Sequence, residues 1–431
     1  MGAESTTQDA LEDASINTNH RVVQSSSGKI RRSSKVNQFD LWLVNKLFAM
    51  SGHPPFTMQL WDGTEINARA SNTHKLFVTD RQALWLVAYD PEFYFGELYS
   101  THRLILTGDL VEFLETDSRH CRSYGNKWID LLQFLRHPPR LNSLSGSQKN
   151  IHHHYNIGND FYSLWLDQDE NQYTCAYYPR EDMTLEQAQV AKLHHVARKL
   201  KLEPGQTVVE AGCGWGGLAR FFAKNYGVNV KAYNISHEQV RFATEKAREE
   251  GVDDKVEYIE DDYRNITGTY DVFVSVGMLE HVGKRQYKTL GSVVDSCLRE
   301  DGIGLIHTIG RNRPGLMNAW IEKRIFPGAY PPSLKEMMDI FEPNHLSILD
   351  LENIRLHYAK TLTHWLERFN ANEDKITDMF DSDFVRAWRL YLAGSITAFT
   401  TAQLQLFQVV FTREFNNSVS SSRSHIYEEG H

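Results

Sequence analysis

Cysteine is scarce in this chain, and long apolar runs are absent. Four cysteines occur in 431 residues, at Cys121, Cys175, Cys213 and Cys297, and no two of them form a CxxC pair. This number is too small for a disulfide scaffold or a thiolate metal site. No segment approaches the roughly 20 apolar residues that a membrane-spanning helix needs. The sequence therefore excludes a disulfide-rich mini-domain and predicts no span across a bilayer.

An excess of positive charge is also missing. The chain has 46 Lys and Arg against 55 Asp and Glu, a net charge of −9. Binding to nucleic acid without sequence preference depends on neutralising phosphates, so we predict no nucleic-acid partner. The proportions of apolar (41%) and charged (23%) residues are ordinary for a globular protein.

The start of the chain lacks the apolar core of a signal peptide, which predicts a cytoplasmic protein. Residues 1–6 do fit the N-myristoylation pattern, a short pattern that also arises by chance. Residues 1–36 are rich in Ser, Thr and Asn, which predicts a flexible tail. Its basic run at 28–35 is either a solvated charge cluster or an electrostatic contact for anionic lipid.

The rest of the chain divides by pattern. Residues 37–115 predict a small α+β domain, with a helix over 39–48 and a hairpin at 56–61 that turns at Asp62-Gly63. Residues 116–150 have the Pro, Ser and Asn content of a linker. Strand and helix patterns then alternate over 151–415, which predicts an α/β domain with a parallel sheet, followed by a frayed tail at 416–431.

A glycine-rich motif follows the first strand of the α/β segment. The apolar run 207–211 leads into Gly212, Gly214 and Gly216, and a helix is predicted from 218 to 226. Glycines allow a tight turn and a close approach of backbone to a ligand. The spacing differs from the GxGxxG of dinucleotide sites, and Glu210 stands two residues before the first glycine. An acidic residue at this place is typical of the first motif of S-adenosylmethionine-dependent methyltransferases.

The next strands are predicted at 228–236, 256–263 and 270–277, each with a polar group at its end. In a doubly wound fold these ends meet at one edge of the sheet. Asn234 and Gln239 are candidates for a ribose, while Asp262 can accept from an adenine amino group and Tyr263 can stack on the base.

These motifs, together with others in order along the chain, resemble the cyclopropane-fatty-acyl-phospholipid synthase and mycolic acid cyclopropane synthase family. The shared motifs lie at 153–162, 173–177, 210–217, 275–283, 305–310, 326–328, 357–362 and 406–408. The resemblance covers about residues 150–411, and residues 40–115 are similar to the family's small N-terminal domain. It implies a Rossmann-like class I methyltransferase domain with a smaller N-terminal α+β domain.

The resemblance also implies a reaction. S-adenosylmethionine gives its methyl group to a cis double bond of an acyl chain, and a bound bicarbonate removes a proton so that a cyclopropane ring closes. It places Glu280, His307 and Tyr358 at the bicarbonate through their side chains, and Cys175 and Ile309 mainly through their backbones. It adds Tyr173, Thr174 and Gly277 to the cofactor site, and His154 and Tyr155 to the acyl or cofactor pocket.

Two simpler chemistries are disfavoured by the residues themselves. Cys175 has no basic neighbour in the sequence that would activate its thiol, so we interpret it as lining the site and not as a nucleophile. The three consecutive histidines at 152–154 point in different directions on any regular element, so we predict no metal site.

Some residues depart from the family pattern. Glu210 stands where Asp is usual, Asn156 where Asp is commoner and Ser395 where Cys is common, and an Arg that often follows Phe399 is absent. These changes are compatible with methyl transfer. They leave open whether a ring closes, or whether the product is a methylene- or methyl-branched chain or a furan precursor.

The resemblance further implies a phospholipid substrate with unsaturated acyl chains at the inner face of a membrane, and a homodimer. The aromatic stretch at 93–99 is either a docking face or part of the core. A different class of function is a lipid-binding protein that has lost catalysis, but the presence of Glu280, His307 and Tyr358 argues against it.

Overall fold

The computed structural model describes residues 35–121, 135–137 and 158–427. Nearly all of the predicted tail and most of the predicted linker fall outside these ranges. So do the myristoylation-like start, the histidines at 152–154, Tyr155 and Asn156. In the ranges described, no helix has the length and apolar character needed to cross a membrane.

The N-terminal part contains a four-stranded sheet. Its strand order is β2 (Glu65–Ile66), β1 (Phe56–Gln59), β3 (His74–Val78) and β4 (Leu104–Thr107). The predicted hairpin is confirmed, because β1 pairs antiparallel with β2 and Gly63 takes a positive φ of 91° in the turn between them. Such a φ favours glycine, which explains the Asp-Gly pair at this position.

Four helices accompany this sheet, and each begins after a side chain that accepts a hydrogen bond from its first turn. The helices are α1 (Gln38–Met50), α2 (Arg81–Tyr89), α3 (Pro91–Ser100) and α4 (Leu110–His120), capped by Asn37, Asp80, Asp90 and Asp109. These are favoured N-cap residues, since a side-chain oxygen satisfies an otherwise unpaired backbone N–H. The helix predicted over 39–48 is confirmed as α1. The last helix, α4, continues past residue 115, where the linker was predicted to begin.

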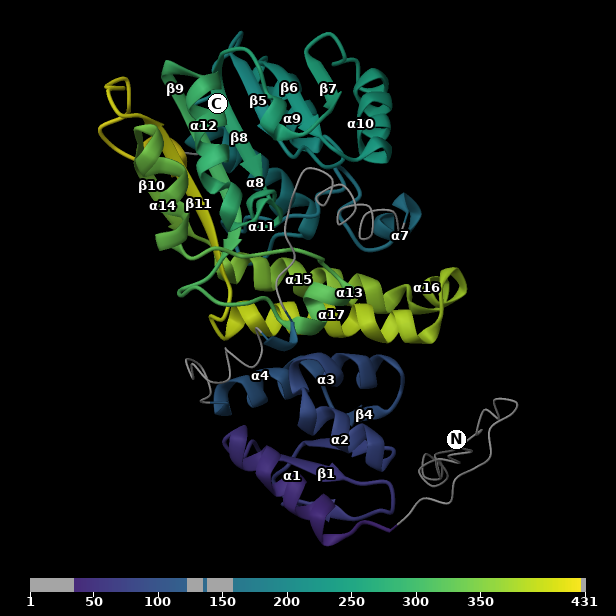
Figure 1. Cartoon of the computed structure of the whole chain (residues 1–431). Helices are drawn as coiled ribbons and strands as arrows, with labels where there is room; N and C mark the ends of the chain where they lie inside the picture. Colours follow the sequence, from purple (N-terminus) through teal and green to yellow (C-terminus); the bar gives the residue numbers. More distant parts are fainter. Residues whose placement is uncertain (1–34, 122–134, 138–157, 428–431) are drawn as a thin grey trace, which may run out of the picture. The chain divides into compact units, whose positions relative to one another are not determined.

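A seven-stranded sheet forms the centre of the C-terminal part (Figure 1). Its strand order is β10 (Leu346–Asn353), β11 (Gln405–Arg413), β9 (Leu298–Gly310), β8 (Tyr270–Val276), β5 (Thr207–Ala211), β6 (Asn229–Asn234) and β7 (Val256–Glu260). The α/β fold predicted from the alternating pattern is confirmed. The prediction of a wholly parallel sheet is wrong, because β11 enters between β9 and β10 and pairs antiparallel with both.

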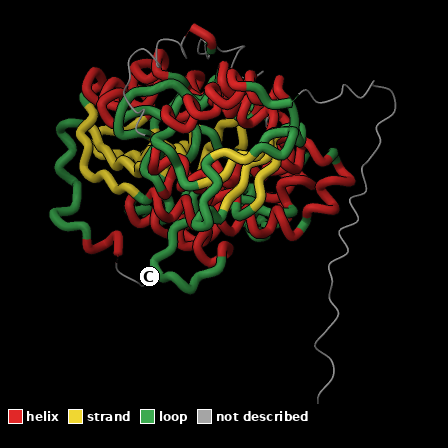
Figure 2. Tube along the Cα trace, turned by 90° about the horizontal axis from the view of Figure 1, so that it is seen from below, coloured by secondary structure: helices red, strands yellow, loops and turns green. Residues whose placement is uncertain are grey.

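Helices cover both faces of this sheet (Figure 2). Val208 and Val209 are neighbours on β5, yet they belong to different apolar clusters. This follows from the alternation of side chains along a strand, and it explains the continuous apolar runs in the sequence. One face is covered by α8 (Leu185–Lys199), α9 (Gly217–Tyr226) and α10 (His237–Glu249), and the other by α12 (Tyr287–Cys297) and α14 (Leu334–Phe341).

The remaining elements are short helices and a long helical pair. The pair is α15 (Arg355–Ala371) and α17 (Ser382–Thr400), which contact each other along their length. The short α-helices are α7 (Asn159–Ser163), α11 (Leu279–Val282), α13 (Ala319–Arg324), α16 (Glu373–Met379) and α18 (Ser424–Tyr427). In the ranges that the structure describes, single 3₁₀ turns occur at Tyr263–Asn265, Lys284–Gln286 and Glu342–Asn344.

The N-terminal helices α3 and α4 pack against α17, and α3 also packs against α13. Arg386 of α17 donates to the carbonyls of Tyr99 and Leu104, at 2.7 and 3.0 Å. No side chain of the aromatic stretch 93–99 is fully exposed, and the ring of Trp320 lies against Gly96. The structure therefore assigns this stretch to internal packing and not to a docking face.

We expect the contact at Gly96 to be sensitive to a single methyl group. A Cβ at Gly96 would lie 2.4 Å from the Trp320 ring, whereas a Cβ at Gly394, in the middle of α17, would meet nothing within 4 Å. Gly96→Ala should lower the free energy of unfolding by about 1–3 kcal/mol through overpacking. Gly394→Ala should raise it by about 0.5–1 kcal/mol through helix propensity. Urea unfolding of both variants checks this, and an equal stabilisation would contradict the contact.

Candidate active site

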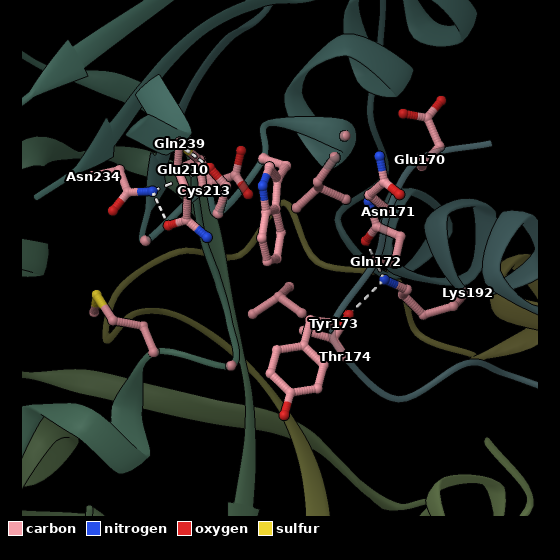
Figure 3. A pocket seen from close by; sticks show the side chains of 18 of the residues that line it. Glu170, Asn171, Gln172, Tyr173, Thr174, Lys192, Glu210, Cys213, Asn234 and Gln239 are labelled. Atoms are coloured by element: carbon pink, nitrogen blue, oxygen red, sulfur yellow. Dashed lines mark hydrogen bonds between the residues drawn. The ribbon is translucent and has the colours of Figure 1, made fainter. Parts of the chain in front are cut away.

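A cavity opens at the carboxyl ends of β5, β6 and β8, where a doubly wound sheet binds its ligands (Figure 3). Eight residues predicted to bind the cofactor line it: Tyr173, Thr174, Glu210, Gly212, Gly214, Asn234, Gln239 and Gly277. The sequence had placed these residues on four separate segments, and the sheet brings them to one cavity.

The glycine turn allows the backbone to approach its neighbours. Gly212 has a φ of +83°, and a Cβ there would lie 2.9 Å from Met278. Gly216 has a φ of +76°, and its carbonyl accepts a hydrogen bond of 2.7 Å from the Tyr258 hydroxyl. Gly216 shapes the turn without lining the cavity, and a side chain at either position would be strained and would clash.

Asn234 and Gln239 form a pair on one wall of the cavity (Figure 3). The Asn234 amide donates to the Gly214 carbonyl at 3.1 Å and to Gln239 Oε1 at 2.9 Å. Gln239 thus has its oxygen engaged, while its buried Nε2 has no hydrogen-bond partner among the described residues. An unpaired buried donor is costly, so this nitrogen is suited to a ligand oxygen. The hydrogen bond from Asn234 fixes the orientation of the Gln239 side-chain amide.

Glu210 is the penultimate residue of β5 and lines the same cavity. It is 2% exposed, and its Oε2 atom has no hydrogen-bond partner within the part of the chain that the structure describes. Burial disfavours the carboxylate and raises the pKa of Glu210 to about 8. A cationic ligand group would satisfy this oxygen and favour its ionised form.

The opposite wall is built from the segment 170–174 and from Lys192 of α8 (Figure 3). Lys192 is fully buried, and its ammonium donates to Gln172 Oε1 at 2.6 Å and to Thr174 Oγ1 at 2.9 Å. The cavity therefore has the buried acid Glu210 on one side. On the other side it has the buried cation Lys192 and a second acid, Glu170, which pairs with Arg220 at 2.9 Å.

Sequence reasoning missed several lining residues: Glu170, Gln172, Lys192, Trp215, Met278 and His281. Trp215 and His281 lie inside motifs that were noticed, so their place in those motifs was an available signal. Lys192 lies in an amphipathic helix, where a lysine normally indicates a solvated face, and no local signal distinguishes it. Burial lowers the pKa of His281 to about 4, which makes it a neutral ring at pH 7.

Asp262 and Tyr263 were predicted at the end of a strand over 256–263, but β7 ends at Glu260, and neither residue lines the cavity. Both Asp262 oxygens accept from the Arg264 guanidinium, at 2.7 and 2.8 Å. The Tyr263 hydroxyl is buried and has no hydrogen-bond partner among the described residues. Their role toward an adenine stays a prediction.

A second group of polar residues surrounds Glu280 on α11. The Thr308 hydroxyl lies within hydrogen-bond distance of both Glu280 Oε2, at 2.8 Å, and the Ile309 carbonyl, at 3.0 Å. Burial raises the pKa of Glu280 to about 7, so the group is poised between its neutral and ionised forms at neutral pH. The Thr308 hydroxyl thus lies between two of the predicted residues, Glu280 and Ile309.

The three other predicted residues, His307, Cys175 and Tyr358, are all buried. His307 precedes Thr308 on β9, is 2% exposed and lies 3.1 Å from the Gln408 side chain. Burial lowers the pKa of His307 to about 3, which keeps its imidazole neutral. Cys175 is fully buried and packs beside Thr361, one turn of α15 from Tyr358. Burial raises the pKa of the Cys175 thiol, which agrees with a residue that is not a nucleophile.

Residues 142–409 match the family model described as mycolic acid cyclopropane synthetase. The chain belongs to this family. The resemblance drawn from the sequence motifs is therefore confirmed, and the chain is an S-adenosylmethionine-dependent methyltransferase.

Individual relatives agree with this assignment. A probable fatty acid methyltransferase of Pseudomonas putida is 33% identical over 84% of this chain and 93% of its own length. The cyclopropane-fatty-acyl-phospholipid synthase of Escherichia coli K12 is 42% identical over 63% of this chain and 69% of its own. The structure of mycolic acid cyclopropane synthase CmaA1 with SAH and CTAB is 28% identical, with a TM-score of 0.59 over 62% of this chain and 98% of that one.

The state of Glu210 leads to a prediction about proton release. At pH 6.5, below its raised pKa of about 8, the free carboxyl holds a proton. Contact with the α-ammonium group of S-adenosylmethionine should favour the carboxylate, so binding should release close to one proton and strengthen as pH rises toward 8. Calorimetry in two buffers of different ionisation enthalpy measures the release. Glu210→Gln, which has no proton to lose, is the control, and equal release by both proteins would contradict this assignment.

Proposed function

We propose that the protein transfers a methylene group from S-adenosylmethionine to a cis double bond of a phospholipid acyl chain and forms a cyclopropane ring. The observation that carries the proposal is the pair of sites just described, a cavity for an ionic cofactor and a buried acid group beside it. The names of the relatives from Escherichia coli and Pseudomonas putida support an acyl substrate.

The cavity residues fit the cofactor by the chemistry of their free atoms. Glu210 Oε2 suits an ammonium group and Gln239 Nε2 suits a ribose oxygen, since each is a buried polar atom without a partner among the described residues. S-adenosylmethionine, when bound, would supply the methyl group. Tyr173, Thr174, Gly212, Gly214 and Gly277 would enclose it.

The group around Glu280 fits a small anion such as bicarbonate. A carboxyl with a pKa of about 7 can keep its proton and donate it in a hydrogen bond, which avoids the repulsion between two anions. His307, uncharged at neutral pH, adds a ring that can either donate or accept. Tyr358 and the backbones of Cys175 and Ile309 would complete the set. Bicarbonate, when bound, would supply a base for the proton lost from the new methyl group.

A second candidate product is a methylene-branched acyl chain. It would form at the same site if the proton left without ring closure. The relative described as a probable fatty acid methyltransferase supports this second product, because that name does not specify a ring. The departures at Ser395 and after Phe399 are the residues to examine if this product forms.

A deuterium assay distinguishes the two products. Purified protein is incubated with S-adenosylmethionine bearing a trideuterated methyl group and with vesicles of cis-monounsaturated phospholipid. A ring keeps two deuterium atoms and resists mild hydrogenation, which is the expected result. A product that keeps two deuterium atoms but takes up hydrogen is the methylene branch, and it would contradict ring closure.

The role of Glu280 is tested in the same assay. Glu280→Gln keeps the size of the side chain but cannot ionise, and we expect it to lower kcat by about a hundredfold or more, in the range of general acid–base groups. Its affinity for S-adenosylmethionine, measured by calorimetry, should stay within about threefold of the wild type, since Glu280 does not line the cofactor cavity. A normal kcat in Glu280→Gln would contradict the proposed role of Glu280 in the reaction.

An exposed aromatic patch offers a way to reach the lipid. Phe39 and Trp42 on α1 and Trp85 on α2 are each about half exposed, and Phe39 contacts both tryptophan rings. The Lys46 ammonium lies over the Trp42 ring, 5.1 Å from its centroid. Aromatic rings with an adjacent cation suit the interface of an anionic bilayer. We infer that this patch, and not the stretch 93–99, docks on the membrane surface.

Removing the patch should weaken membrane binding. The triple variant Phe39→Ala, Trp42→Ala, Trp85→Ala should lose at least about tenfold in partition to phosphatidylglycerol vesicles, since apolar area and charge set such binding. Phe415→Ala is the matched control, because this ring is 87% exposed but lies after β11, on a different element. Vesicle sedimentation measures the partition, and an undiminished triple variant would contradict the patch. Homodimer formation and the cytoplasmic location stay predictions.

A further inference from the structure

Lys192 is a fully buried lysine that the proposed chemistry does not use. It reaches the cofactor cavity from α8, and the ammonium donates to two neutral side chains of the opposite segment, Gln172 and Thr174. Asp167 is the first of the acidic groups that favour its charge, and burial lowers the pKa of Lys192 only to about 8. The ammonium is therefore charged at pH 7.

The two hydrogen bonds fix the orientation of their acceptors. An ammonium group has only donors, so Thr174 Oγ1 must accept from Lys192, and the hydroxyl hydrogen of Thr174 is left for another acceptor. Gln172 accepts through Oε1 in the same way, which turns its amide nitrogen toward Gly217 at the start of α9. Both side chains thus become donors at the cavity wall opposite Glu210.

We infer that Lys192 is a positioning residue for the carboxylate end of the cofactor. Through Gln172 and Thr174 it presents hydrogen-bond donors and a positive field to the α-carboxylate of S-adenosylmethionine, while Glu210 on the other wall faces the α-ammonium group. This inference rests on the cofactor site of the proposed function and assigns the two ends of the amino-acid moiety to opposite walls.

A second buried lysine on the same helix provides a matched control. Lys199 is 1% exposed and lies two turns further along α8, where it pairs with Glu352 at 2.6 Å and does not line the cavity. Replacing either lysine by methionine removes a buried charge from α8. A loss of stability is therefore expected in both variants, but only Lys192→Met should change recognition of the carboxylate.

The test compares two ligands by calorimetry in the absence of lipid. S-adenosylmethionine has the carboxylate, and decarboxylated S-adenosylmethionine lacks it. Lys192→Met should weaken the first ligand by about 10- to 100-fold, as expected for hydrogen bonds to a charged group, and leave the second within about threefold. Lys199→Met should leave the affinity for both ligands within about threefold of the wild type.

Variants of Thr174 keep the inference testable if Lys192→Met fails to fold. Thr174→Val removes the hydroxyl and should show the same selective loss, whereas Thr174→Ser keeps the hydroxyl and should bind both ligands like the wild type. Equal weakening of both ligands by Lys192→Met or by Thr174→Val would overturn the inference, as would a selective loss in Lys199→Met. Because no lipid is present, the result is independent of whether a ring or a branch is the product.

Discussion

The cofactor cavity depends on two titratable groups that are buried at the carboxyl ends of parallel strands. Glu210 and Lys192 are both almost wholly buried and line the same cavity. Burial raises the pKa of Glu210 and lowers the pKa of Lys192, each to about 8. Isolated charges of this kind are costly in a protein interior. A cofactor that carries both an ammonium and a carboxylate would compensate each of them. Burying Glu210 and Lys192 costs free energy in the absence of the cofactor. Binding of the cofactor would offset this cost and so contribute to its affinity.

Burial of titratable groups also determines the chemistry around Glu280. Its raised pKa and the lowered pKa of His307 have a common cause, which is burial. The imidazole is neutral at pH 7 and the Glu280 carboxyl is poised between its two forms, so protonation of Glu280 leaves these two side chains without charge. Thr174 and Cys175 are adjacent in the chain, and Lys192 acts electrostatically on both Cys175 and His307. The segment 173–175 thus lines the cofactor cavity with Tyr173 and Thr174 and continues directly into the buried Cys175.

Much of this arrangement could be predicted from the sequence, because local signals mark it. The strand before Gly212 and the helix after Gly216 follow from apolar pattern and glycine spacing, and the structure has both. The antiparallel β11 could not be predicted, since an apolar run is the same in either direction. Lys192 was missed because burial is a tertiary property. The two interpretations of residues 93–99 were separated only by the contact of Gly96 with Trp320.

The central claim is that opposite walls of the cavity recognise opposite ends of one amino-acid moiety. The most direct test is a crystal structure of the protein with S-adenosylhomocysteine. We predict the ligand's amino nitrogen within hydrogen-bond distance of Glu210 Oε2, and its carboxylate within the same distance of the Thr174 hydroxyl. A ligand with these two ends exchanged, or with its carboxylate in contact with neither Thr174 nor Gln172, would contradict the account.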